Sequence, residues 1–353
     1  MACVAPMPHN IVLANPRDRL VRLGALWSAA RLASSWWPRL DRRLCAAAIQ
    51  DRNVAGVNDL SGLPSQQRFF DVIFLGTGTS EGVPRVSCLT NRYKRCPVCF
   101  AALQVGNKNR RRNTSIIVRY PRRDGTRMNI LVDAGKFFYH SALQWFPYYG
   151  LRHLDAVIIT HSHADAIGGL DDLRDWTNNI QDSIPIYVAQ RDLEVMGKTH
   201  YYLLDPTVIT EGTQVSKLQF KVIDEQPFFV EDVKVTPLPV WHGPGYRSLG
   251  FRIADMCYIS DVSEIPEETY ALLQNCDLLV VDALRPDRPS TTHFSLDQAL
   301  DAVKRVHPKR TLFTGMMHTM DHDKVNKQLA DLKHSEGLDV QLSFDGQLVQ
   351  LRL

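Results

Sequence analysis

Two histidines and an aspartate alternate within residues 160–165, directly after the apolar run 156–159. The β-branched residues of that run predict a buried strand, and residues 170–174 beyond the motif predict the first turns of a helix. Alternate side chains of an extended segment point the same way, so His161 and His163 can converge on one metal ion. Histidines at this spacing, at the carboxyl end of a strand, therefore indicate metal-dependent chemistry.

Four further ionisable side chains stand at the ends of predicted strands or just before a predicted helix: Asp133, His242, Asp261 and His293. Each alone is common in turns, caps and surfaces. Their order along the chain, together with the H-x-H-x-D motif that ends at Asp165, is the specific signal. Three imidazoles and one carboxylate suffice for a catalytic metal ion, which lowers the pKa of its bound water from ~15.7 toward ~7.

Cysteines supply a second candidate metal site. The chain has seven, an odd number, and Cys88, Cys96 and Cys99 lie close together in the polar loop 87–112. This clustering is more typical of a reducing compartment and a metal knuckle than of a disulfide framework. Three thiolates need a fourth ligand to complete a tetrahedral zinc site. The alternative is a set of thiols that bind no metal.

The ordered set of aspartates and histidines resembles that of the metallo-β-lactamase superfamily, over residues 69–353. The segment 74–84 and the cysteine knuckle resemble the branch that contains the cyclic-phosphate phosphodiesterase of bacterial phosphonate degradation. The transfer-RNA 3′-end endonucleases are more distant relatives of that branch. The resemblance implies an α/β fold, specifically a four-layer αβ/βα sandwich with a small cysteine zinc knuckle. It also implies a metal site at one edge, between the sheets.

The same resemblance implies roles for individual residues. The first metal ion would be held by three imidazoles, those of His161, His163 and His242. Asp261 would bridge to a second ion that Asp165 also binds, and Asp133 would orient the ligand loop through hydrogen bonds. The fourth ligand of a structural zinc on the cysteines would be His318, with His322 as the alternative.

Two positions depart from the superfamily pattern. Ala166 and Gly315 stand where histidines of the second metal site are usual, and neither side chain can bind a metal. Asp171 or Asp172 are candidate substitutes, although acidic residues there also favour a helix N-terminus without any metal. We therefore expect one firmly held active-site ion, zinc or manganese, and at most a weakly held second one.

Short strands separated by helices must position these residues. Ser295 and Gln298 form a capping box that predicts a helix through Val306. Asp345-Gly346 predicts a hairpin between the last two strands. Other strands are predicted at residues 70–75, 115–120, 129–132, 156–159, 185–188, 220–223, 234–238, 249–253, 257–260, 277–281 and 311–314.

Residues 1–66 differ in composition from residues 67–353, which we expect to form one hydrolase domain. The extension is rich in arginine and poor in acids, which is typical either of an organelle-targeting segment or of an accessory helix. No apolar run reaches the ~20 residues that cross a bilayer. We therefore expect a soluble intracellular protein, cytoplasmic or organellar (mitochondrion or plastid), with no membrane partner. A homodimer is compatible with the sequence.

A basic run at residues 107–113 has two interpretations. It is either a patch that attracts phosphate or a solvated charged face, and the sequence favours the solvated face. The net charge of +3 is too small to indicate nucleic-acid binding by itself.

Together these features predict a metal-dependent hydrolase, specifically a phosphodiesterase that acts on a small or cyclic phosphodiester through a metal-bound hydroxide. Asp165 is the candidate base for the water, and His293 is the candidate acid for the leaving oxygen. The alternatives are a thioester or lactone hydrolase on the same fold, a non-hydrolytic redox metal protein, and a non-catalytic binding protein. A small phosphoester is the expected partner, and nucleic acid is less favoured.

Overall fold

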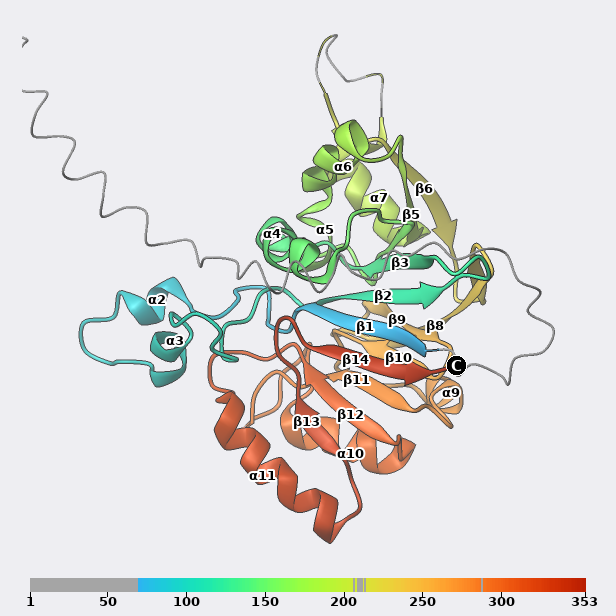
Figure 1. Cartoon of the computed structure of the whole chain (residues 1–353). Helices are drawn as coiled ribbons and strands as arrows, with labels where there is room; N and C mark the ends of the chain where they lie inside the picture. The colour runs from blue at the N-terminus through green and yellow to red at the C-terminus, as the bar shows by residue number, and fades with distance from the viewer. Residues whose placement is uncertain (1–68, 206, 208–211, 213, 287) are drawn as a thin grey trace, which may run out of the picture. The chain divides into compact units, whose positions relative to one another are not determined.

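The computed structural model describes residues 69–205, 207, 212, 214–286 and 288–353 of the chain. The predicted targeting segment or accessory helix lies outside these residues. Strands and helices alternate through the described part and build a layered domain (Figure 1). None of its helices combines the length and the hydropathy that a membrane-spanning helix requires.

The described residues form two sheets of seven strands each. The first sheet has the order β14-β1-β2-β3-β4-β5-β6. Its strands are antiparallel from β14 to β3 and parallel from β3 to β6. The strands are β1 (Phe69–Gly76), β2 (Ser115–Pro121), β3 (Arg127–Val132), β4 (Ala156–Ile158), β5 (Ile184–Ala189), β6 (Leu218–Ile223) and β14 (Leu348–Arg352).

The second sheet has the order β13-β12-β11-β10-β9-β8-β7. Here β7 to β10 are antiparallel, and β10 to β13 are parallel. The strands are β7 (Phe228–Val230), β8 (Val233–Trp241), β9 (Arg247–Ile253), β10 (Met256–Ile259), β11 (Leu278–Asp282), β12 (Arg310–Thr314) and β13 (Val340–Leu342).

The two sheets pack face to face through a shared apolar core. Successive side chains of a strand point to opposite faces, and β1 shows the consequence. Val72 and Phe74 pack between the sheets in one cluster with Phe251 of β9. Ile73 and Leu75 point the other way, into the cluster beneath the helices. Both faces of the strand are therefore buried.

Helices cover the outer face of each sheet and complete the predicted αβ/βα order (Figure 1). Phe138, Trp176 and Met196 pack from helices onto the first sheet, and Val303 and Leu329 pack onto the second. The helices are α2 (Val86–Leu89), α3 (Pro97–Ala101), α4 (Phe138–Tyr149), α5 (Ala164–Ile167), η3 (Leu170–Leu173), α6 (Arg174–Asn179), α7 (Gln190–Thr199), α8 (Tyr201–Leu204), α9 (Glu267–Leu272), α10 (Leu296–Val306) and α11 (His322–Ser335).

The predicted capping box at the start of α10 is confirmed. The Ser295 hydroxyl accepts from the Gln298 backbone N–H at 3.3 Å, and the Gln298 side chain accepts from the Ser295 N–H at 3.0 Å. These bonds satisfy two N–H groups that a helix start leaves unpaired. The cap also determines where the preceding loop, which carries His293, meets the second sheet.

The predicted hairpin around Asp345-Gly346 is wrong. β13 pairs with β12 in the second sheet, and β14 pairs with β1 in the first. Leu342 and Val349 accordingly pack in two different apolar clusters. The turn is real, because Gly346 has a φ of +85° and its N–H donates to the Phe74 carbonyl at 2.7 Å. It carries the chain from one sheet to the other, where each strand buries its apolar side.

Candidate metal centres

Both sheets bring candidate metal ligands to one edge of the sandwich. His161 and His163 follow β4, His242 follows β8, and Asp261 follows β10. His293 lies in the loop between β11 and α10. The packing of the two sheets brings these segments, which are far apart in sequence, into contact.

The three imidazoles of His161, His163 and His242 form the centre of this site. Their ring centroids lie 4.7 to 5.1 Å apart, and one nitrogen of each lies within 4.8 Å of the others. Nε2 of His161 is buried and has no hydrogen-bond partner among the described residues. Leaving a buried polar atom unpaired costs ~1–3 kcal/mol. A zinc or manganese ion would satisfy all three nitrogens, so the residues fit a metal.

Asp133 supports His161 from behind. Its carboxylate accepts hydrogen bonds from the backbone N–H and the hydroxyl of Thr160, at 2.9 and 2.8 Å. The same hydroxyl lies 2.8 Å from Nδ1 of His161. Burial lowers the pKa of His161 to about 3, which keeps the ring neutral, as a metal ligand must be. This chain of contacts holds the orientation of the ring.

Tyr246 and Asp192 are parts of the site that sequence reasoning missed. Tyr246 stacks on His163 with ring centroids 5.4 Å apart, and its hydroxyl donates to Asp192 at 2.8 Å. Nδ1 of His242 lies 2.7 Å from the Thr292 carbonyl, which leaves Nε2 of that ring for the site. A single tyrosine and a single aspartate in unrelated segments carry no spacing signal that would have identified them.

His293 lies against two carboxylates beside the three imidazoles. Its Nδ1 is 2.8 Å from Asp282 and 3.8 Å from Asp261, and its ring centroid is 4.9 Å from that of His242. Burial opposes protonation, but the two carboxylates and that of Asp165 raise the pKa of His293 to about 9. Asp282 was not predicted, although its place at the carboxyl end of β11 was a usable signal.

Asp261 and Asp165 occupy different parts of the site. A carboxylate oxygen of Asp261 lies within 4.8 Å of ring nitrogens of His242 and His293, whereas Asp165 belongs to no such group among the described residues. Burial opposes ionisation of Asp261, yet the surrounding imidazoles lower its pKa to about 2. Burial and the charge of Asp261 raise the pKa of Asp165 to about 6. Asp261 therefore adjoins the three imidazoles through His242, and Asp165 lies outside both ligand groups of the described residues.

Gly315 and Ala166 both have structural surroundings that suit a small residue. Gly315 has a φ of +70°, and a Cβ placed there would lie 2.2 Å from Oδ1 of Asp282. The Asp282 carboxylate thus occupies the space that a side chain at position 315 would need. Ala166 is buried in the cluster beneath α4, and its carbonyl accepts from the Ala134 N–H at 2.7 Å.

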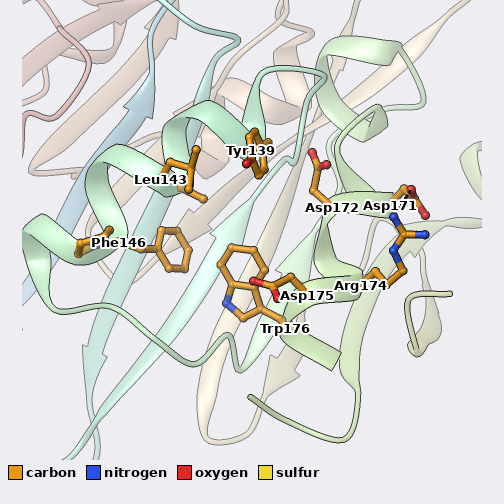
Figure 2. A pocket seen from close by; sticks show the side chains of 10 residues that line it. Tyr139, Leu143, Phe146, Asp171, Asp172, Arg174, Asp175 and Trp176 are labelled. Carbon is orange, nitrogen blue, oxygen red and sulfur yellow. Dashed lines mark ion pairs between the residues drawn. The ribbon is translucent and has the colours of Figure 1, made fainter. Parts of the chain in front are cut away.

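Asp171 and Asp172 do not replace the missing ligands. They line a pocket of about 510 Å³ together with Tyr139, Arg174 and Trp176 (Figure 2). Asp171 lies 3.9 Å from Arg174, and neither aspartate belongs to a candidate ligand group in the described part of the chain. Both stand in the first turn of the short helix η3, in agreement with the helix-start alternative.

The loop cysteines meet His318, not His322. Nδ1 of His318 lies 3.3 Å from Sγ of Cys88 and 3.4 Å from Sγ of Cys96. With Cys99 these atoms all lie within 4.8 Å of one another, a spacing that suits tetrahedral zinc with bonds of about 2.0–2.3 Å. His322 lies elsewhere, with Nε2 3.0 Å from the Asn326 amide. The loop is thereby joined to the segment after β12.

Replacement of His318 tests the cysteine site. We expect His318→Ala to lose about one zinc per chain, because three thiolates alone leave the tetrahedron incomplete. Metal analysis of the purified variants measures this loss. The matched control is His322→Gln, which should keep its zinc. Equal zinc content in His318→Ala and the wild type would contradict the assignment.

Replacement of Gly315 tests the altered second site. We expect Gly315→His to add no metal and to lower the free energy of unfolding, by ~1–3 kcal/mol for the backbone strain and ~1–3 kcal/mol for the collision with Asp282. Denaturant unfolding and metal analysis measure both effects. Gly106→His is the control, because Gly106 has a φ of +78° but open space around it. A stable Gly315→His protein with an additional tightly bound ion would contradict this account.

Three comparisons with known proteins agree with this geometry. The family model described as "Beta-lactamase superfamily domain" matches residues 128–316. A solved diphosphatase from the PhnP family superposes with a TM-score of 0.67 and 27% identity, covering 82% of this chain and 99% of that one. Zn²⁺-bound PqqB from Methylobacterium extorquens has a TM-score of 0.60 and 18% identity, covering 80% of this chain and 100% of that one, which is likeness of fold alone.

A curated relative adds a different similarity. It is a protein of Porphyromonas gingivalis named octanoyltransferase, 31% identical over 279 residues. The match covers 78% of this chain but only 52% of the relative, so the chain spans about half the length of that protein. With the family model matching more than half of the sequence, and with the sandwich and the histidine edge in place, the chain belongs to the β-lactamase superfamily and has the metallo-β-lactamase fold of its hydrolases.

Proposed function

We propose that the protein is a metal-dependent phosphodiesterase that acts on a small or cyclic phosphodiester. The observation that carries the proposal is the convergence of the His161, His163 and His242 rings. Within this cluster, Nε2 of His161 is buried and has no hydrogen-bond partner among the described residues. The three histidines would hold one zinc or manganese ion, with Asp261 beside them. When bound, such an ion supplies Lewis acidity toward a phosphoryl oxygen and acidifies water. The 27% identity to a PhnP-family diphosphatase supports phosphoester chemistry.

His293 has the position of a proton donor in this reaction. Its Nδ1 is held by Asp282 at 2.8 Å, so Nε2 is the atom left to donate to the leaving oxygen. Asp282 is a positioning residue, because it reaches the reacting atoms only through His293. Its own place depends on the missing side chain at Gly315. A histidine fixed in this way supplies general acid catalysis without a second tightly held ion.

Asp165 is the candidate acceptor for the proton of the attacking water. It follows His163 by two residues and lies at the border of the imidazole cluster, outside the candidate ligand groups of the described residues. A carboxylate free of direct metal coordination can accept a proton and orient water. Asp165 would then act on the attacking water, and His293 would act on the leaving oxygen.

An acyl ester or thioester is the second candidate substrate class. The similarity to the protein named octanoyltransferase favours it, since acyl transfer and thioester hydrolysis break the same kind of bond. Hydrolysis of bis(p-nitrophenyl) phosphate and of an octanoyl thioester, measured side by side with zinc- and manganese-loaded protein, separates the two classes. Faster turnover of the diester supports the proposal, and turnover of the thioester alone contradicts it. Turnover of neither ester would favour the redox or non-catalytic alternatives.

Replacement of His293 tests the catalytic assignment. We expect His293→Ala to lower kcat for the diester by about 10²–10⁴-fold, the usual contribution of general acid–base catalysis, with an unchanged content of active-site metal. Asp282→Asn should lower kcat with a smaller change in KM, because it only loosens the ring. His334→Ala, on the exposed side of α11, is the control. Loss of active-site metal from His293→Ala would show that His293 is a metal ligand. Full activity of this variant would show that His293 has no catalytic role.

A further inference from the structure

A second cavity lies away from the imidazole cluster, between the loop that follows α3, helix α4 and the β13–β14 crossover. Its volume is about 290 Å³, near the lower end of the range for small-molecule sites. It contains most of the basic run at residues 107–113. The lining combines three cations with three aromatic rings, those of Lys108, Arg110, Arg112, Trp145, Tyr148 and Phe344.

The cations of this pocket lack carboxylate partners. Lys108 lies over the Phe344 ring, 4.5 Å from its centroid, and Arg112 donates to the neutral Gln144 amide at 2.7 Å. The Arg110 side chain makes no hydrogen bond or ion pair with any described residue. Burial lowers the pKa of Arg112, and the neighbouring Arg110 lowers it further, against the opposing effect of Asp345. Two guanidinium groups that repel each other beside a cavity favour a bound anion.

Asp345 offsets only part of this charge. One of its carboxylate oxygens accepts from the Thr77 hydroxyl at 2.8 Å, and the other accepts from the Arg112 backbone N–H at 2.8 Å. Both oxygens accept hydrogen bonds that hold the turn, and neither makes a side-chain hydrogen bond to the described cations of the pocket. Three positive charges against one carboxylate leave the lining cationic.

The aromatic side of the pocket offers faces for stacking. The Trp145 and Tyr148 rings meet edge to face with centroids 5.9 Å apart, and Tyr148 is 62% exposed. Trp145 is held against Gly346, where a Cβ would lie 2.1 Å from the indole ring. Nε1 of Trp145 is buried and has no partner among the described residues. A pair of aromatic rings that lines a cavity suits a flat heteroaromatic group.

A neighbouring cavity of about 310 Å³ shares Arg110 and Arg112 with this one. Its lining also includes Phe137, His140 and one carboxylate, that of Glu81, which pairs with Arg85. The two guanidinium groups thus lie at the boundary between the two cavities. A ligand with a flat ring at one end and phosphates at the other has room on both sides of the arginines.

We propose that this pocket binds a nucleoside phosphate, with the base against Tyr148 and Trp145 and the phosphates between Arg110, Arg112 and Lys108. Of the two interpretations of the basic run, this is the phosphate-binding one. The aromatic wall distinguishes the pocket from a plain basic surface, since base stacking and phosphate contacts are both needed for full affinity. The inference concerns binding and is independent of the hydrolytic reaction.

Calorimetric titration of the full chain with ADP, pyrophosphate and adenosine tests the proposal at one fixed salt concentration. We expect ADP to bind at least about tenfold more tightly than either half of the molecule, because stacking alone changes affinity by this order. Equal affinity for pyrophosphate and ADP would show a non-specific charged patch and overturn the proposal. Absence of ADP binding at millimolar concentration would overturn it as well.

Variants locate the binding. Arg110→Ala and Tyr148→Ala should each weaken ADP binding by about tenfold without loss of folding, because neither side chain carries a structural hydrogen bond among the described residues. Arg123→Ala is the control for net charge, since Arg123 is 87% exposed and pairs with Asp232 at 3.8 Å. Equal weakening by Arg110→Ala and Arg123→Ala, or ADP binding unaffected by Arg110→Ala and Tyr148→Ala, would place the ligand elsewhere.

Discussion

The packing of the two sheets through their inner faces is the constraint on which the metal edge depends. The imidazoles come from segments that follow β4 in one sheet and β8 in the other, so they meet only if the sheets hold a fixed separation and angle. Tightly packed side chains such as Phe74 and Phe251 provide that rigidity. Nε2 of His161 is buried and unpaired among the described residues, so holding the ligands in place without a metal ion is unfavourable in free energy.

The close approach of Gly315 to Asp282 is central to the proposed chemistry. The absence of a side chain at position 315 makes room for a buried carboxylate, and that carboxylate holds His293 beside Asp261. Within the superfamily pattern, the position of a second-metal ligand is thus exchanged for an aspartate–histidine pair. In the proposed reaction, an ion held by the imidazoles would supply activation of water, and His293 would protonate the leaving group.

Most strands of the sandwich could be predicted from the sequence. Buried strands consist of β-branched and apolar runs, such as residues 115–120, and these runs are easy to recognise. The histidines could also be predicted, since their order and spacing are chemical requirements. Asp282 ends a predicted strand, which was a usable signal, but its contact with His293 depends on the space at Gly315, which only three-dimensional packing reveals. Helix α4 was missed for a related reason: its aromatic residues and Pro147 conceal its amphipathic pattern.

The hairpin error has a similar physical origin. Asp345-Gly346 is a turn in either topology, and local turn chemistry does not specify which sheet edge the next strand joins. That choice is made by long-range pairing of β14 with β1. The same crossover forms one wall of the basic and aromatic cavity, for which we propose nucleoside phosphate binding.

We expect the imidazole cluster to hold a single firm ion and the cysteines to hold another. Anomalous diffraction at the zinc edge, from crystals of the zinc-loaded protein, tests it most directly. We expect one strong peak among His161, His163 and His242, and one among the three loop cysteines and His318. A further peak of comparable occupancy between Asp165 and Asp261 would contradict it, because it would establish the two-ion site that Ala166 and Gly315 are expected to abolish.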